Sequence, residues 1–382
     1  MSADARLLDR VRDRLPAGQV TPDAVLAAAR AAGVVLGADG LDDVTTALHA
    51  ELIGAGALEP LLQEPDVTDV LVNGSFGVWV DRGHGVERTR LDLGGEPQVR
   101  ALATRLAASA GRRLDDASPF VDARLPRGVR LHVALPPLVD GGTHLSLRVP
   151  ARRVLGLDDL VRLGTVPPAW AEVLGRLVAK RRAFLVTGGT GAGKTTVLGA
   201  LLGLVPGHER IVIAEDCAEL RVDHPHVVRL ESRTPNVEGR GAVTLTDLVR
   251  QALRMRPDRL VVGEVRGGEV RELLPALNTG HEGGCGTVHA NDATELPARL
   301  EALGALAGLD APAVHAQLAG AVQVVLHVER RGPARRLVQV GVVEREGDRV
   351  RVLPALVADA APGSSGRRGP GWSALRDRWG LL

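Results

Sequence analysis

The most informative stretch of this sequence is Phe184-Leu-Val-Thr-Gly-Gly-Thr-Gly-Ala-Gly-Lys-Thr-Thr196. It contains Gly188-x-x-x-x-Gly193-Lys194-Thr195, the pattern of a phosphate-binding loop. The apolar run 183–186 predicts a buried strand before the loop, and a helix is expected to begin near Gly193. Glycines let backbone N–H groups turn toward an anion, and a helix N-terminus adds positive partial charge. The stretch therefore predicts a strand, a phosphate-binding loop and a helix in succession.

Two side chains of the loop carry specific roles in this interpretation. Lys194 can reach the β- and γ-phosphates of a nucleotide, and the Thr195 hydroxyl can ligate Mg²⁺. The chain has two lysines, Lys180 and Lys194, so arginine supplies nearly every other cation. A compact ammonium on a flexible stem suits this position better than a planar guanidinium. The predicted nucleotide-binding residues are Gly188, Gly189, Thr190, Gly191, Ala192, Gly193, Lys194, Thr195 and Thr196.

Composition limits what the rest of the chain can be. With 382 residues the chain is too long for one core, and 45% hydrophobic with 24% charged residues is typical of globular proteins. A net charge of +1 argues against a protein that coats nucleic acid. No apolar run approaches the roughly 18 residues of a membrane span, and we expect no signal peptide. Cys217 and Cys285 lack metal-ligand spacing, so we expect two buried, reduced thiols and no zinc.

Changes in sequence character divide the chain into five expected segments. Residues 1–58 read as helices, and residues 59–150 as a small α+β domain. Residues 151–168 read as a linker, residues 169–356 as the domain that holds the loop, and residues 357–382 as a flexible tail rich in small residues. Strands and helices alternate in 169–356, which predicts an α/β fold with a mostly parallel sheet. Its expected strands are 183–186, 211–214, 227–230, 259–262 and 286–288, with later strands at 322–328 and 337–343.

Polar residues end three of these expected strands. Glu215 ends the second strand, Glu264 follows the fourth and His289 follows the last of the first five. Ligands bind at the carboxyl ends of strands in an open parallel sheet, so these residues are candidates for a role in nucleotide hydrolysis. Acids at strand ends are usually solvated loop residues, and a lone histidine is usually structural. The neighbouring phosphate-binding loop favours the functional interpretation of all three.

Four segments in order resemble the boxes of one ATPase superfamily. The loop, Ile213-Ala-Glu-Asp-Cys-Ala-Glu-Leu220, Val261-Val-Gly-Glu-Val-Arg-Gly-Gly-Glu269 and Gly286-Thr-Val-His-Ala-Asn291 look like the Walker A, Asp, Walker B and His boxes of the type II/type IV secretion ATPases. Segments such as Val70-Leu-Val-Asn-Gly-Ser75 and Arg130-Leu-His-Val-Ala-Leu-Pro-Pro137 are similar to the CpaF-like branch, which powers tight-adherence (Flp-type) pili. The resemblance covers roughly residues 58–345. The tetracysteine zinc module of the type II branch is missing, which favours the CpaF-like branch.

This resemblance implies a RecA-like ATPase domain preceded by a PAS-like α+β domain. It also implies ATP and Mg²⁺ as ligands, a homo-oligomeric ring (usually a hexamer), a cytoplasmic location at the inner face of the cell membrane, and an inner-membrane platform protein as partner. By motif position, Glu264 is the acid that activates water, Glu215 is the Asp-box acid, near Mg²⁺ through a water, and His289 is the His-box residue. Arg130 and Arg148 match arginines that reach the phosphates. Gly263-Glu264 stands where most P-loop enzymes have an aspartate, so the identity of the base stays open, as does the subunit on which each arginine acts.

Two other functions compete with this interpretation. A RecA-like DNA translocase for conjugation or DNA uptake would need a basic channel with aromatic residues, whereas aromatics make up 2% of the chain. A nucleotide-gated scaffold without turnover is disfavoured by intact Lys194, Thr195 and Glu264. We also expect that the chain is not an ABC-type ATPase, because it has no LSGGQ-like signature. Pilus extension, pilus retraction and protein secretion are not distinguished by the sequence.

Overall fold

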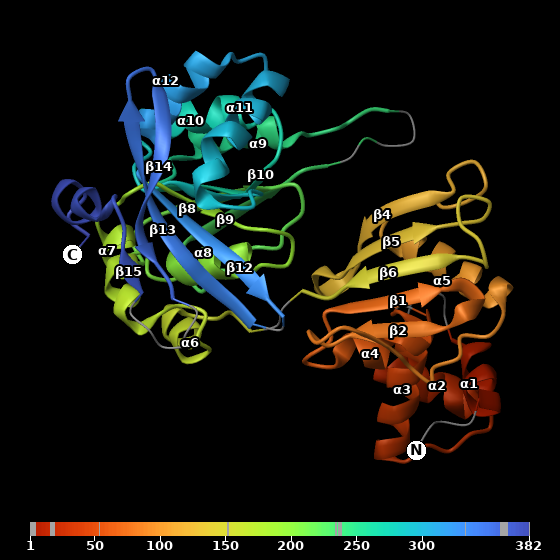
Figure 1. Cartoon of the computed structure of the whole chain (residues 1–382). Helices are drawn as coiled ribbons and strands as arrows, with labels where there is room; N and C mark the ends of the chain where they lie inside the picture. Colours follow the sequence, from red (N-terminus) through yellow and green to blue (C-terminus); the bar gives the residue numbers. More distant parts are fainter. Residues whose placement is uncertain are drawn as a thin grey trace. The chain divides into compact units, whose positions relative to one another are not determined.

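The computed structural model describes residues 5–15, 20–52, 54–150, 153–233, 235, 239–332, 334–359 and 366–381. The chain divides into two compact units, residues 1–152 and residues 153–382 (Figure 1). Each unit has hydrophobic cores of its own, and the two are described in turn.

The first unit begins with three helices, α1 (Ala5–Arg12), α2 (Pro22–Ala31) and α3 (Ala38–Leu52). The Thr21 hydroxyl accepts a hydrogen bond from the Ala24 N–H at 3.3 Å, and Pro22 occupies the first helical position. Both features favour a helix start there, as the sequence predicts. Apolar residues at helical spacing, such as Val25, Val44 and Leu48, form the small core of these helices.

The rest of the first unit is an antiparallel sheet with two helices. The elements are α4 (Glu59–Gln63), β1 (Asp69–Asn73), β2 (Val78–Asp81), β3 (Val86–Arg88), α5 (Glu96–Ser109), β4 (Phe120–Arg124), β5 (Arg130–Ala134) and β6 (His144–Arg148). The six strands lie in the order β3-β2-β1-β6-β5-β4. Alternating residues such as Val70, Val133 and Leu147 point to a core that also holds Val99 and Leu106 of α5. The sequence predicts this α+β character, and residues on the other face alternate with the core residues.

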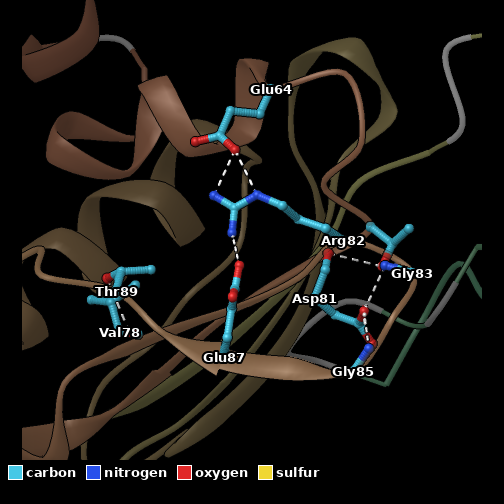
Figure 2. Close-up of polar contacts among 9 residues, drawn as sticks. Glu64, Val78, Asp81, Arg82, Gly83, Gly85, Glu87 and Thr89 are labelled. Atoms are coloured by element: carbon cyan, nitrogen blue, oxygen red, sulfur yellow. Dashed lines mark hydrogen bonds and ion pairs between the residues drawn. The ribbon is translucent and has the colours of Figure 1, made fainter.

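One arginine ties the β2–β3 hairpin to the end of α4 (Figure 2). Arg82 donates from Nε and Nη2 to Oε2 of Glu64, at 2.9 and 2.7 Å, and from Nη1 to Glu87. In the turn itself, the Asp81 carboxylate accepts hydrogen bonds from the N–H groups of Gly83 and Gly85. A side chain that bonds backbone two residues ahead is a common way to fix a tight turn.

The second unit is built on a nine-stranded sheet of order β15-β14-β13-β12-β7-β11-β10-β8-β9. The strands are β7 (Phe184–Thr187), β8 (Ile211–Glu215), β9 (Val227–Glu231), β10 (Arg259–Val265), β11 (Cys285–Val288), β12 (Val324–Arg331), β13 (Ala334–Glu346), β14 (Arg349–Val357) and β15 (Arg367–Arg368). The strands from β9 to β12 in this order pair in parallel, and the remaining pairs are antiparallel. The expected α/β fold with a mostly parallel sheet is confirmed.

Helices cover both faces of this sheet. One core contains residues of α6 (Leu157–Arg162), α7 (Ala171–Ala179) and α8 (Lys194–Leu202), together with Phe184 and Val186. The opposite core contains residues of α9 (Leu245–Ala252), α10 (Val270–Asn278), α11 (Leu296–Leu306) and α12 (Ala311–Ala321), together with Leu185. Successive residues of β7 therefore face opposite cores, and all four of its residues are buried. Among the described residues, no helix is long and apolar enough to cross a membrane.

Several segments differ from the sequence-based expectations. Of the linker expected over 151–168, residues 153–168 belong to the second unit, because α6 forms there and buries Leu157 and Leu160 in the core. Helix α12 and strand β14 were not predicted, although buried and more exposed residues alternate over the first four residues of β14. Cys285 is buried as expected, but Cys217 is only half-buried.

The described part of the expected flexible tail is folded onto the second unit. Leu375 and Leu381 are both fully buried in the same core as Trp170. β15 pairs with β14 through Arg368 and Leu356, and the Arg368 guanidinium lies 4.2 Å from the centroid of the Trp372 ring. The expectation of a flexible tail over 357–382 is therefore wrong for residues 366–381. The expectation failed because the few apolar residues of this segment are enough to dock it on an existing core, although they could not form a core alone. Residues 360–365 lie outside the described part.

Leu375→Ala is expected to lower the stability of the second unit by about 2–4 kcal/mol, the usual cost of emptying a fully buried leucine site. The neighbouring substitution Arg376→Ala is the matched control, because this exposed arginine pairs with the adjacent Asp377 and surface changes usually stay within about 0.5 kcal/mol. Urea unfolding of the full chain followed by circular dichroism measures both. Equal unfolding midpoints for the two variants would show that the segment does not contribute to the core.

Candidate active site

The phosphate-binding loop follows the central strand β7 and leads into α8. Gly188 has φ +152°, and a Cβ there would lie 2.2 Å from the Val328 carbonyl oxygen, so only glycine fits. Gly191 and Gly193 have φ +68° and +96°, a region that other residues rarely adopt. Gly193 is the N-cap of α8, which begins at Lys194. The loop thus has the strand, glycine and helix context that the sequence predicts, with Gly189, Thr190, Ala192 and Thr196 completing it.

Lys194 is almost fully buried against this loop. Its Nζ donates hydrogen bonds to the carbonyl oxygens of Gly188 and Gly189, both at 3.0 Å. Burial lowers the pKa of Lys194, and the negative charges of Glu264 and Glu219 oppose that shift. A buried ammonium held at the mouth of the loop is placed to meet phosphate oxygens.

Glu264 lies beside this lysine. It comes near the end of β10, and its Oε1 is 4.0 Å from Nζ of Lys194. Its side chain is 46% exposed, so water can reach the carboxylate. Of the sequence-predicted candidates, Lys194 and Glu264 are thus brought together directly.

Glu215 lies one strand away and is in a different environment. It ends β8, is buried, and its Oε1 accepts hydrogen bonds from the N–H groups of Leu220 at 2.9 Å and Glu219 at 3.1 Å. Its Oε2 is also buried and has no hydrogen-bond partner among the residues that the structure describes. Burial raises the pKa of Glu215 to about 7, against the two backbone hydrogen bonds, which lower it.

The packing around Gly263 explains why a glycine precedes Glu264 in the Walker B segment. A Cβ at this position would lie 2.5 Å from Cγ of Glu215, so the missing side chain makes room for the buried glutamate. The Gly263 carbonyl oxygen also accepts a hydrogen bond from Oγ1 of Thr287, at 2.6 Å. The ends of β8, β10 and β11 are therefore linked through this glycine.

Two histidines, His289 and His327, lie near the loop. Of these, His289 was predicted from the sequence and His327 was missed. His289 is half-buried and directly follows Val288, whose register partner in β7 is Thr187. His327 of β12 is buried, and its Nδ1 lies 2.9 Å from Oγ1 of Thr187, the residue before the loop. Burial lowers the pKa of His327, and a backbone hydrogen bond with Asn291 opposes the shift. His327 thus connects the end of β7 to the segment after His289. A polar residue inside the apolar run 324–328 was the available sequence signal.

Arg130 and Arg148 belong to the first unit. They are direct register partners in β5 and β6, and both are exposed. Arg124 of β4 lies opposite Arg130, which gives a row of three arginines on one face of the sheet. Arg148 donates from Nε to Oδ1 of Asp69 at 3.2 Å. The structure thus groups the two predicted arginines, and their action on a nucleotide remains a prediction.

Comparison with known proteins gives the family. The family model described as "Type II/IV secretion system protein" matches residues 51–346, which is most of the chain. The chain belongs to the type II/IV secretion system family. A protein of Mycobacterium tuberculosis named for conjugal transfer is 56% identical over 319 residues, covering 82% of this chain and 91% of the relative. The type IV secretion system protein PtlH of Bordetella pertussis is 35% identical and covers 74% of this chain and 92% of its own length.

Solved structures agree on the fold of this family. The pilus retraction motor PilT with bound ADP is similar with a TM-score of 0.53 and 20% identity, over 84% of this chain and 85% of PilT. The ATPase DotB of Legionella pneumophila gives a TM-score of 0.51 and 17% identity, over 85% and 91%. The phosphate-binding loop with its lysine, in a member of the type II/IV secretion system family, identifies the chain as an ATP hydrolase. The relatives are named for conjugal transfer and type IV secretion, so they support the family rather than the narrower CpaF-like branch.

Proposed function

We propose that the chain is the ATPase motor of a type II/IV secretion-class machine in the cytoplasm, acting as a homo-oligomeric ring, a hexamer by family resemblance, at the inner face of the cell membrane. The observation that carries the proposal is the pairing of Lys194 Nζ with the accessible carboxylate of Glu264, 4.0 Å apart, at the end of a phosphate-binding loop. In this arrangement the lysine and the loop N–H groups bind the triphosphate of ATP. Glu264 orients a water and accepts its proton as the water attacks the γ-phosphorus, while the bond from that phosphorus to the β–γ bridging oxygen breaks and ADP leaves.

The residues present fit a magnesium ion. Glu215 holds a buried carboxylate oxygen to which no described residue donates a hydrogen bond, and Thr195 places a hydroxyl in the first turn of α8. Carboxylate and hydroxyl oxygens are the donors that Mg²⁺ prefers. Thr195 would hold the ion directly and Glu215 through a water. When bound, Mg²⁺ would offset the charge of the phosphates during transfer.

The narrower role of the motor has three candidates: pilus assembly, protein secretion and DNA transfer. Segments of the first unit resemble the CpaF-like branch, which supports tight-adherence (Flp) pilus assembly through an inner-membrane platform protein. The relative at 56% identity is named for conjugal transfer, which favours a type IV secretion or DNA-transfer machine. An ATPase assay of the purified chain, alone, with inner-membrane fractions and with single-stranded DNA, separates these roles. Stimulation by membranes alone supports pilus assembly or protein secretion, and stimulation by DNA supports a translocase.

Glu264→Gln is expected to leave ATP binding intact and to lower kcat by at least about 10², the usual loss when a general base is removed. Glutamine keeps the size and hydrogen-bonding capacity of the side chain but cannot take a proton. Steady-state phosphate release and binding of a fluorescent ATP analogue measure the two effects. Glu215→Gln is the comparison, and a larger loss of kcat in that variant with unchanged Mg²⁺ affinity would reverse the two roles.

Glu215→Gln should also change how stability depends on pH. The folded carboxyl keeps its proton up to about pH 7, whereas an unfolded one ionises near its ordinary value of 4.5. The unfolded state therefore loses this proton first, and wild-type stability falls as pH rises through that window. The glutamine variant lacks the titration, so its stability relative to wild type should rise by up to about 3 kcal/mol between about pH 4.5 and 8. Urea unfolding without nucleotide or Mg²⁺ measures this. A stability difference that does not change with pH would show that the buried carboxyl is not protonated.

A further inference from the structure

The β12–β13 hairpin carries two arginines to the phosphate-binding loop. Arg330, near the end of β12, and Arg335, near the start of β13, are direct register partners. The strand β12 runs parallel to β7 and pairs with it from Val324 to His327. Figure 1 labels β12 and β13, the two strands of the hairpin. The hairpin therefore starts from the strand that borders the loop on the side opposite β11.

Both arginines lie against the glycines of the loop. Arg335 donates from Nε to the Gly191 carbonyl oxygen at 3.3 Å. A Cβ on Gly193 would meet Cδ of Arg335 at 3.4 Å, so the arginine stem packs directly over this glycine. A Cβ on Gly191 would lie 3.5 Å from Nη1 of Arg330.

The strand that leads to these arginines is anchored beside the loop. β12 pairs with β7 through Leu326 and His327, and the Val328 carbonyl oxygen contacts Gly188 so closely that no side chain would fit. Thr187 and His327 add a side-chain hydrogen bond between the same two strands. These contacts hold the start of the hairpin beside the loop.

We propose that Arg335, with Arg330 beside it, binds the polyphosphate of the nucleotide held by this loop. In this step the Arg335 guanidinium exchanges the neutral Gly191 carbonyl for a charged phosphate oxygen. Hydrogen bonds to charged acceptors are shorter and about twice as strong as those to neutral ones, which favours the exchange. The inference rests on the proposed function and adds to it: the second unit supplies its own arginines to the nucleotide, besides Lys194 and independently of Arg130 and Arg148.

Nucleotide affinity of the full chain tests this inference. Arg335→Ala is expected to raise the Kd for fluorescent ATP and ADP analogues by about 10- to 100-fold, the range for one lost charged hydrogen bond. Arg335→Lys should keep part of the affinity because it keeps the charge, and Arg330→Ala should shift Kd in the same direction. The matched control is Arg331→Ala, since Arg331 is exposed on the same hairpin and pairs with Glu329. The melting temperature without nucleotide should be the same in all four variants and wild type.

Two results would overturn the inference. One is a Kd of Arg335→Ala within twofold of wild type while Lys194→Ala loses binding, which would leave the proposed function standing. The other is a loss of affinity that comes with a lower melting temperature and is not restored by lysine, which would mean that Arg335 only holds the loop in shape. Wild-type binding by Lys194→Ala would instead contradict the nucleotide site itself.

Discussion

Replacing Lys194 with alanine is expected to abolish nucleotide binding or hydrolysis. Its Nζ is held by the carbonyl oxygens of Gly188 and Gly189 at the loop, and the side chain is almost fully buried there. When a nucleotide binds, its β- and γ-phosphates meet this ammonium, which is the cation that the loop itself positions for them. Alanine would leave the backbone N–H groups to bind the triphosphate without that charge.

The other lysine of the chain supplies the control for this prediction. Lys180 is exposed at the C-cap of α7, away from the loop in sequence, so Lys180→Ala should keep wild-type turnover. Binding of a fluorescent ATP analogue and steady-state phosphate release compare the two variants. Turnover near wild type in Lys194→Ala would contradict the assignment of the loop.

Arg148→Ala and Arg130→Ala are expected to keep nucleotide binding within about tenfold and to lower hydrolysis by about 10²–10⁵, the range for removing a catalytic arginine. Guanidinium pairs strongly with phosphate and can do so through two hydrogen bonds. A motor also needs ATP to bind one conformation better than another, and we propose that these arginines contribute to that preference. Their exposure on one face of the sheet leaves them accessible to such a ligand.

The competing interpretation is that both arginines are ordinary surface residues. Arg148 already pairs with Asp69, and exposed ion pairs of this kind contribute about 0–1 kcal/mol to stability. Arg88→Ala is the control, because Arg88 is exposed on the edge strand β3 of the same sheet. ATPase rates of the purified variants, compared as assembled oligomers, distinguish the two interpretations. Wild-type rates in Arg130→Ala and Arg148→Ala would remove both from the mechanism.

Much of the site could be predicted because it depends on short-range sequence patterns. The loop needs a strand, glycines and a helix in succession, and residues 184–202 show all three. Glu215, Glu264 and His289 could be placed together because parallel strands end at one edge of a sheet. The proximity of Glu264 to Lys194 needed the structure, because it depends on the order of the strands in the sheet, which the sequence does not give.

Other features depend on contacts between distant segments, which no local pattern shows. Gly263 is required because Glu215 packs against it from a neighbouring strand, and the sequence marks only an unusual Gly-Glu pair. His327 and Arg335 reach the loop from a strand pair more than a hundred residues further along the chain. Residues 366–381 looked too poor in apolar side chains to fold, yet Leu375 and Leu381 need only a place in a core that already exists.

The most direct test of the central claim is phosphate release by the purified full-length chain with ATP and Mg²⁺, with Glu264→Gln measured alongside. We expect Mg²⁺-dependent turnover by the wild-type chain, and a variant that binds ATP but turns over at least about 10² more slowly. No turnover by the wild-type chain under any condition, with membranes or DNA present, would rule out an ATPase motor and favour a nucleotide-gated scaffold.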